Sequence, residues 1–162
     1  LFGYRYTIKP YFFSVTSLAE MDRKISEAIT DGGYAIAVFD ADVANRNDAE
    51  KKKLESIRRK YANKNNVLLC DSFTSIEYWF LLHFDNTNRY FKDSSATESE
   101  LRKYIPDYDK KSKFLQNTQW VKDLCSESKL KLAQERAKLF GQNGESYTNL
   151  YKAFEFLDRK KN

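Results

Sequence analysis

The sequence of 162 residues contains little of what several classes of protein need. It has two cysteines and one histidine, and neither Cys70 nor Cys125 belongs to a CxxC pair. A framework of disulfide bonds is therefore excluded, and one histidine with two distant cysteines does not make a zinc site. We expect both cysteines to be reduced and buried.

Three further absences limit the function. No apolar run approaches the length of a membrane span, so we expect a cytoplasmic protein without membrane association. There is no glycine-rich loop of the kind that binds phosphate. The single histidine, His83, has no serine or cysteine partner in a nucleophile motif, so covalent catalysis finds no support.

The composition that is present indicates a folded domain. Hydrophobic residues make up 41% of the chain and aromatic residues 15%, so we expect a core although 31% of the residues are charged. The net charge of +5 is compatible with a polyanionic partner but does not require one. The length suits one domain, with an α/β core over residues 1–86 and a helical extension over residues 87–162.

A strand–helix–strand pattern indicates the fold class. Six apolar residues at 34–39 follow the turn pair Gly32-Gly33, which predicts a strand buried on both faces. Residues 47–61 are polar with a thin apolar seam, which predicts a helix lying on the sheet, and a second apolar strand follows at 67–70. Such a crossover makes the strands parallel neighbours. We therefore predict an α/β protein with a small, mainly parallel sheet flanked by helices and a helical C-terminal half.

Local signals predict the remaining elements. Aromatic and β-branched residues favour a strand at the start of the chain, capping residues mark helix starts, and continuous apolar character indicates a buried helix. The predicted elements are a strand at 4–15 interrupted by Pro10, a helix beginning at Ser17, a buried helix at 73–84, a helix beginning at Thr97, helices at 120–124 and 130–140, and a last helix beginning at Ser146.

Two aspartates directly follow the first strand of this pattern. Asp40 and Asp42 are two residues apart, so on an extended chain their carboxylates point the same way at the edge where open α/β sheets bind ligands. Close carboxylates repel each other unless a cation joins them, and oxygen ligands suit Mg²⁺ or Mn²⁺. Asp71, at the end of the second strand, is a reserve ligand. The alternative is that the aspartates only end the strand and cap the next helix.

Glu77 and His83 are the candidate catalytic residues. Burying Glu77 costs free energy unless something pairs with it, and a metal shared with Asp40 and Asp42 would do so. We therefore count Glu77 as a third metal ligand that orients a ligand or water. The spacing from Thr74 to Glu77 also fits a capping box, in which Glu77 would bind only a backbone amide. His83 is assigned to holding an acid through a ring nitrogen, with a satisfied core histidine as the alternative.

Basic residues gather in three clusters. Those at 51–53 and 58–60 have the pattern of solvated helix faces. The third cluster interleaves with aromatic side chains, a combination that can hold a nucleic-acid backbone and stack a base. Its members are Lys110, Lys111 and Lys113, together with Tyr104, Tyr108 and Phe114. We predict nucleic-acid contacts at these three lysines.

Three segments resemble the RloB-like (AbiLii-type) family of bacterial proteins, which has a Toprim-like core. They are residues 38–42 (VFDAD), residues 75–84 (SIEYWFLLHF), which are close to the family's "FEyWLLLHF" stretch, and residues 108–110 (YDK). The resemblance implies a Mg²⁺-dependent nuclease acting on DNA or RNA, linked with restriction loci and phage defence, and with other defence-system proteins as partners. Within it, Asp40 and Asp42 would hold the ion and Lys110 would bind a phosphate.

One feature of the family pattern is absent. Toprim-like sites use a glutamate after the first strand, in a segment resembling "cEGxTE", and this chain has no such segment. Because the chain begins at Leu1 and not at a methionine, we expect that strand to lie upstream of it. Without its glutamate, the site would lack a general base or a metal contact.

Two other classes stay open. An Asp-x-Asp motif after an apolar strand also occurs in haloacid-dehalogenase-type phosphatases, although Ala44 stands where that family has Thr or Val. The chain could also be a non-catalytic interaction module that keeps the fold without the chemistry. Metal-dependent cleavage of nucleic acid would distinguish the nuclease from the module.

Overall fold

The computed structural model describes residues 7–12, 17–42, 47–141 and 145–159. Its helices and strands alternate in the first half of the chain, and helices dominate the second half. In chain order the elements are α1 (Leu18–Thr30), β1 (Ala35–Asp40), α2 (Asp48–Tyr61), β2 (Val67–Phe73), α3 (Glu77–Leu81), α4 (Ser94–Leu101), α5 (Ser112–Leu115), α6 (Gln119–Leu124), α7 (Glu127–Phe140), β3 (Tyr147–Thr148) and α8 (Tyr151–Arg159).

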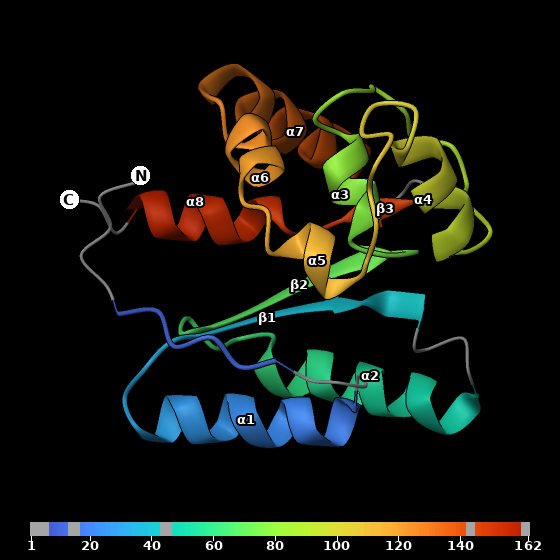
Figure 1. Ribbon diagram of the computed structural model, residues 1–162. Coiled ribbons are helices and arrows are strands. Elements are labelled where there is room, and N and C mark those ends of the chain that lie inside the picture. Colours follow the sequence, from blue (N-terminus) through green and yellow to red (C-terminus); the bar gives the residue numbers. More distant parts are fainter. Residues whose placement is uncertain (1–6, 13–16, 43–46, 142–144, 160–162) are drawn as a thin grey trace.

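The strands form one sheet in the order β1-β2-β3, with α1 and α2 on one face and the helices that follow β2 on the other (Figure 1). β1 and β2 are parallel, with Ala35 opposite Val67 and Asp40 opposite Ser72. β3 is antiparallel to β2, and Thr148 lies opposite Ser72. The predicted α/β class and the parallel pairing of the first two strands are confirmed. The short β3 makes the sheet mixed.

The first core lies between the sheet and the α1–α2 layer. Ser17 caps the start of α1, and its side chain accepts a hydrogen bond from the Glu20 backbone N–H at 3.3 Å, as the capping-box spacing predicts. Asn47 caps the start of α2 in the same way, with the Glu50 N–H at 2.9 Å. Apolar side chains from both helices and two strands fill this core: Leu18, Met21, Ile25, Ala35, Phe39, Leu54, Ile57, Tyr61 and Val67.

A second core lies on the opposite face of the sheet, around α3 and α7. Trp79 of α3 stacks on Phe154 of α8, with ring centroids 5.6 Å apart. The buried members of this core are Tyr78, Trp79, Leu81, Leu82, Phe91, Leu130, Ala133 and Ala137. This packing fixes α3, whose first residue is Glu77, against the carboxyl end of the sheet. In the described ranges, no helix has both the length and the apolar character needed to cross a membrane.

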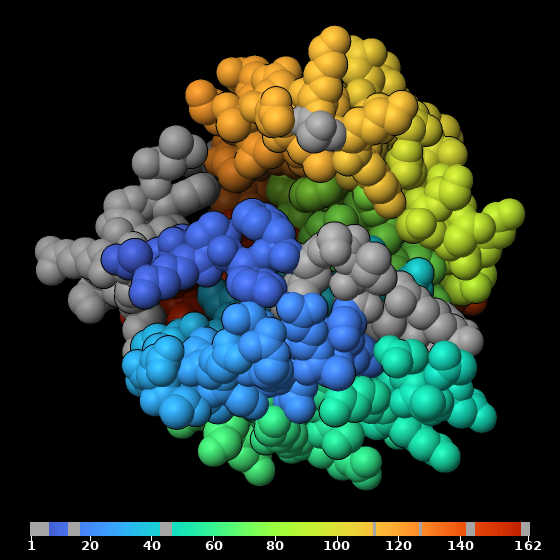
Figure 2. Space-filling view, turned by 60° about the horizontal axis from the view of Figure 1, so that its bottom comes forward, coloured from blue at the N-terminus to red at the C-terminus, as the bar shows by residue number. Residues whose placement is uncertain are grey.

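Residues 7–12 pass between α1 and the C-terminal helices (Figure 2). The Tyr11 hydroxyl donates a hydrogen bond to Glu20 at 3.1 Å, and the Lys24 ammonium lies 4.6 Å from the centre of the Tyr11 ring. These residues form no strand, because Pro10 lacks the backbone N–H that a strand interior requires. The predicted strand at 4–15 is therefore wrong over 7–12, and its other positions lie outside the described residues.

The helix expected at 73–84 is shorter than predicted. β2 continues to Phe73, and α3 itself covers Glu77–Leu81, followed by turns. Residues of such a uniformly apolar run fit a buried strand and a buried helix equally well, so periodicity could not locate the boundary. The chain therefore leaves the sheet and enters α3 within a few residues, which brings Glu77 close to the strand ends.

Two other helix starts also differ from the sequence prediction. The last helix was expected from Ser146, but β3 comes first and α8 begins at Tyr151. The helix expected from Thr97 begins earlier, at Ser94, because the Asp93 side chain accepts a hydrogen bond from Ala96 N at 2.8 Å. The cysteines are free, and Cys70 is buried as expected, whereas Cys125 is only half-buried.

Candidate functional site

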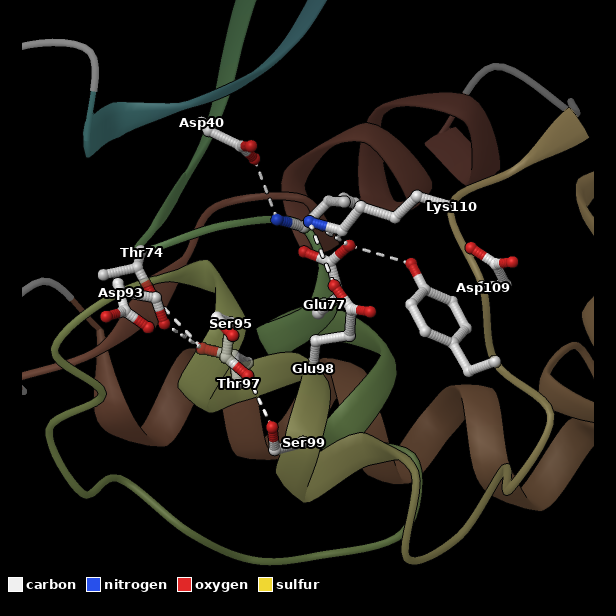
Figure 3. A network of polar contacts seen from close by, with 12 residues as sticks. Asp40, Thr74, Glu77, Asp93, Ser95, Thr97, Glu98, Ser99, Asp109 and Lys110 are labelled. Atoms are coloured by element: carbon white, nitrogen blue, oxygen red, sulfur yellow. Dashed lines mark hydrogen bonds and ion pairs between the residues drawn. The ribbon is translucent and has the colours of Figure 1, made fainter.

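Asp40 is the last residue of β1, and its side chain is directed toward α3 (Figure 3). One carboxylate oxygen, Oδ1, accepts a hydrogen bond of 2.9 Å from the backbone N–H of Ile76. This bond joins the carboxyl end of the first strand to the start of α3. It holds Asp40 next to the residue that follows Ile76, which is Glu77.

Glu77 is almost completely buried, with 1% of its surface exposed. Its Oε1 accepts a hydrogen bond from the Tyr108 hydroxyl at 2.8 Å and lies 3.0 Å from the Lys110 ammonium (Figure 3). Its Oε2 is buried and has no hydrogen-bond partner, and the nearby Ser75 hydroxyl is also buried without one. A buried carboxylate oxygen without a donor is costly, so this atom is available to a ligand.

The interpretation of Glu77 as a helix cap is wrong. The cap position of α3 is occupied by Ile76, which makes no side-chain cap hydrogen bond. The Glu77 carboxylate instead faces Tyr108 and Lys110, which belong to the segment between α4 and α5. Glu77 is therefore held by residues far away in the sequence and not by its own helix.

Lys110 lies between two glutamates. Besides Glu77, its ammonium is 3.7 Å from Oε2 of Glu98 in α4, and 46% of its side-chain surface is exposed. Burial works against the charged form of Lys110, but Glu77, Glu98 and Asp40 outweigh it and raise its pKa. The ammonium therefore remains charged at neutral pH and partly compensates the surrounding carboxylates.

The carboxylates of Asp40, which is half-buried, and Glu77, which is buried, have opposite pKa shifts. Burial, followed by repulsion from Glu77 and Asp42, raises the pKa of Asp40 to about 6, although the Ile76 amide and Lys110 act in the other direction. Burial also opposes ionisation of Glu77, but the Ser75 hydroxyl, Lys110 and Tyr108 hold its pKa below the usual value. Ser75 does so by proximity, since it lacks hydrogen-bond geometry. Glu77 therefore stays ionised, and the ionised form of Asp40 is the one that is disfavoured.

Asp42 and Glu77 lie near enough to Asp40 for both to act on its charge. Yet among the residues described, no three His, Cys, Asp or Glu side chains are arranged so that they could hold a metal ion as they stand. Mg²⁺ commonly uses one or two carboxylates and completes its shell with water and phosphate oxygens. The unpartnered Oε2 of Glu77 and the repelled Asp40 fit that kind of site, and they do not fit a cage made of three protein side chains.

The comparison with known protein families agrees with this arrangement of segments. A model described as RloB-like protein matches residues 14–157. The chain belongs to the RloB-like family. No curated protein and no solved structure matches it. The match includes β1 with Asp40, α3 with Glu77, and Lys110, so the resemblance first carried by three short segments extends over most of this RloB-like chain.

His83 does not approach the acidic residues of the RloB-like protein in the contacts of the described residues. Its Nδ1 lies 2.9 Å from the Trp79 carbonyl one turn earlier, and its ring packs edge-on against the Trp79 ring. Burial lowers its pKa to about 4, and the cations Lys129 and Arg136 act in the same direction. His83 is therefore neutral and buried in the second core, so the geometry favours a satisfied core histidine over the predicted contact with an acid.

Asp71 does not have the free carboxylate at the strand end that was expected of a reserve ligand. It lies inside β2, two residues before the strand ends, and is 3% exposed. Its carboxylate accepts hydrogen bonds from Arg58, from the Tyr147 hydroxyl at 3.0 Å and from the Asn149 amide at 2.7 Å. These bonds use both carboxylate oxygens. Asp71 therefore links α2, β2 and the β3 region and is not free to bind a metal.

The other two lysines of the basic cluster, Lys111 and Lys113, are exposed at the surface. Lys113 is exposed, and Lys111 has 84% of its side-chain surface exposed, with its ammonium 3.7 Å from Asp109. Of the three predicted nucleic-acid contacts, only Lys110 lies in the candidate site.

The sequence assigned Tyr108 a different role and gave Glu98 none. Tyr108 was expected to stack on a base, but its hydroxyl binds Glu77, and burial and that neighbour raise its pKa strongly. Glu98 carried no functional signal, because its position in a polar helix resembles that of any surface glutamate. The segment 108–110 of the family resemblance was the one signal that could have indicated the Tyr108 contact.

Proposed function

We propose that this RloB-like protein is a Mg²⁺-dependent nuclease that hydrolyses phosphodiester bonds of DNA or RNA. The observation that carries the proposal is the proximity of Asp40 and Glu77. These carboxylates lie at the carboxyl end of the sheet, burial followed by repulsion from Glu77 raises the pKa of Asp40, and one oxygen of Glu77 is buried without a partner. A divalent cation at this place would remove both costs.

Each residue of the site has a role in this proposal. Asp40 and Asp42 would hold the ion, and Oε2 of Glu77 would bind it directly or orient a water molecule. Bound Mg²⁺ supplies an activated water and neutralises charge on the phosphate. Lys110 would bind a phosphate oxygen as a point charge, and the exposed Lys111 and Lys113 would contact the neighbouring backbone of the nucleic acid.

Membership of the RloB-like family supports a role in bacterial phage defence. The sequence resembles proteins linked with restriction loci, whose products act on foreign nucleic acid. We therefore include other defence-system proteins among the proposed partners. Mn²⁺ is proposed as an alternative ion, because it accepts the same oxygen ligands.

One contact favours a second function. Lys110 already compensates Glu77, as in an internal ion pair that needs no metal. Because the Glu77 charge is compensated without a metal, a non-catalytic interaction module that keeps the fold is the alternative. The two functions differ in whether metal-dependent cleavage occurs at all.

Cleavage of end-labelled single- and double-stranded DNA and RNA, with Mg²⁺ or with EDTA, tests the nuclease. We expect cleavage only with the metal, and its loss in Asp40→Asn with the fold retained by circular dichroism. The matched control is Asp31→Asn, because Asp31 is exposed at the end of α1, in the turn that precedes β1. Cleavage that persists in Asp40→Asn, or that is equally lost in both variants, would contradict the site. Nucleic-acid binding without cleavage by the wild type would favour the module.

A further inference from the structure

The candidate site contains an ammonium group at the place where its carboxylates face one another (Figure 3). In the described part of the chain, Lys110 is the cation that contacts both Glu77 and Glu98, at 3.0 Å and 3.7 Å, and its charge also acts on Asp40. The carboxylates of Glu77, Glu98 and Asp40 all act on this ammonium, and Arg102 is the second cation, paired with Glu98, so three carboxylates share two positive charges. The site is therefore short of positive charge even with Lys110 in place.

Glu77 keeps a hydrogen-bond donor when the Lys110 ammonium moves away. The Tyr108 hydroxyl keeps its hydrogen bond to Oε1, and Oε2 has no donor to lose. Oε2 belongs to a side chain that is 1% exposed, so it is an unpartnered acceptor held in the site and not a group in solvent. The unpartnered Oε2 therefore indicates a cation site independently of the clustered carboxylates.

Glu98 also keeps a partner when Lys110 leaves. Its Oε1 pairs with Arg102 one helical turn further along α4, while Lys110 approaches the other oxygen. Lys110 itself is attached by a flexible four-carbon stem and is nearly half exposed. The ammonium can therefore rotate into solvent, and each glutamate retains one hydrogen-bonding neighbour.

We propose that Lys110 is a displaceable counter-ion: its ammonium stabilises Glu77 and Glu98 in the metal-free protein, gives way to a divalent cation, and then binds a phosphate oxygen of the nucleic acid. At equal distance a divalent ion attracts each carboxylate about twice as strongly as the ammonium does. The proposal rests on the metal site of the proposed function. It adds that the metal displaces the ammonium first and that the ammonium binds phosphate afterwards. The same residue compensates the empty site and recognises the polyanion.

Metal binding to the full chain without nucleic acid tests the competition. Calorimetric titration with Mg²⁺, and with Mn²⁺ followed by electron paramagnetic resonance, gives the dissociation constant. In Lys110→Met, which keeps the stem and removes the charge, we expect metal to bind about tenfold more tightly, because the competing charge is gone. Lys111→Met is the matched control, since it removes the same charge from an exposed neighbour, and we expect less than about a twofold change there.

Chemical modification of the wild type provides a measurement that needs no variant. Acetylation with an amine-reactive ester, read by mass spectrometry, should be slow at Lys110 in the metal-free protein and faster with Mg²⁺. Added nucleic acid should protect Lys110 again. Lys111 in the same molecule is the internal control, because its ammonium is exposed throughout.

These measurements separate the counter-ion proposal from the nuclease. Tighter metal binding by Lys110→Met together with Mg²⁺-dependent acetylation supports displacement even if no substrate is cleaved. Unchanged or weaker binding by Lys110→Met, an effect equal to that of Lys111→Met, or no metal binding by either protein overturns it. Cleavage that depends on Mg²⁺ while Lys110 stays protected would retain the nuclease and overturn the displacement.

Discussion

The carboxylate of Asp40 accepts a 2.9 Å hydrogen bond from the backbone N–H of Ile76, 36 residues further along the chain. This bond joins the end of β1 to the start of α3, and Glu77 follows directly. Two acids that are far apart in the sequence thereby come close in a largely buried place. The proximity costs stability, since Asp40 is repelled by Glu77, and it creates the feature on which the proposed chemistry depends.

Asp40→Asn should stabilise the metal-free protein at alkaline pH and abolish cleavage. The pKa of Asp40 is raised from 3.8 to about 6, so its ionised form is disfavoured in the folded state. The amide removes this charge but can still accept from Ile76. We expect the free energy of unfolding in urea at pH 8 to rise by about 1–3 kcal/mol.

The stabilisation by Asp40→Asn is expected only over a defined range of pH. A raised carboxyl pKa destabilises the folded protein above about pH 6, and the effect is relieved as the pH falls through 6 toward 3.8. The gain from Asp40→Asn should therefore shrink below pH 6 and vanish near pH 4. A loss of stability at pH 8 in Asp40→Asn would contradict the raised pKa of Asp40.

Tyr108→Phe should destabilise the protein although it removes only a hydroxyl. The Tyr108 hydroxyl is a donor to the buried Glu77 carboxylate, and hydrogen bonds to charged groups contribute about 1.5–3 kcal/mol. We expect a loss of this size in urea unfolding. Tyr104→Phe is the control, because Tyr104 is 42% exposed and should change stability by less than about 0.5 kcal/mol.

A double-mutant cycle tests whether the stability lost in Tyr108→Phe comes from the hydrogen bond to Glu77. Glu77→Gln removes the charge that Tyr108 stabilises, so Tyr108→Phe should cost less in the Glu77→Gln background than in the wild type. Equal costs in both backgrounds would show that the Tyr108 hydroxyl acts through something other than Glu77.

Because of His83, the free energy of unfolding should fall as the pH is lowered below 6.5. His83→Gln should remove this dependence. Burial lowers the pKa of His83 from 6.5 to about 4, so between these values the unfolded state binds the proton more readily. The contribution is complete above pH 6.5 and is lost as the pH falls toward 4, by about 3 kcal/mol in all.

The comparison of wild type with His83→Gln isolates this contribution. Their difference in unfolding free energy should decrease by about 3 kcal/mol between pH 8 and pH 4, and the contribution of Asp40 cancels because both proteins contain it. His83 is the single histidine, so no other imidazole interferes. A constant difference over this range would mean that His83 is not buried in its neutral form.

Lys111→Ala and Lys113→Ala should weaken nucleic-acid binding without altering metal binding. Both side chains are exposed near the candidate site, and each lost phosphate contact should reduce the salt slope of the binding constant by about one. Fluorescence anisotropy over a range of salt concentrations measures both quantities. Lys131→Ala, an exposed lysine on α7, is the control for net charge, and an equal effect there would mean that the binding is not localised to the cluster.

The sequence by itself determined the strand–helix–strand unit and the position of Asp40. These follow from local patterns: an apolar run after a glycine pair, a polar helix with an apolar seam, and side chains that alternate along a strand. Helix starts marked by a capping side chain, such as Ser17, were also predictable, because the bond that forms the cap spans only three residues.

The tertiary structure alone decided which residues share the site. Glu77 meets Tyr108 31 residues later, and Ser72 pairs with Thr148 76 residues later, so both contacts depend on how whole elements pack. A local pattern could show that Glu77 needed a partner, because burying a lone carboxylate is costly, but not that Lys110 would be one. Likewise, Asp71 and Asp40 follow similar apolar runs, and only the packing of α2 and β3 around Asp71 separates a structural carboxylate from a candidate ligand.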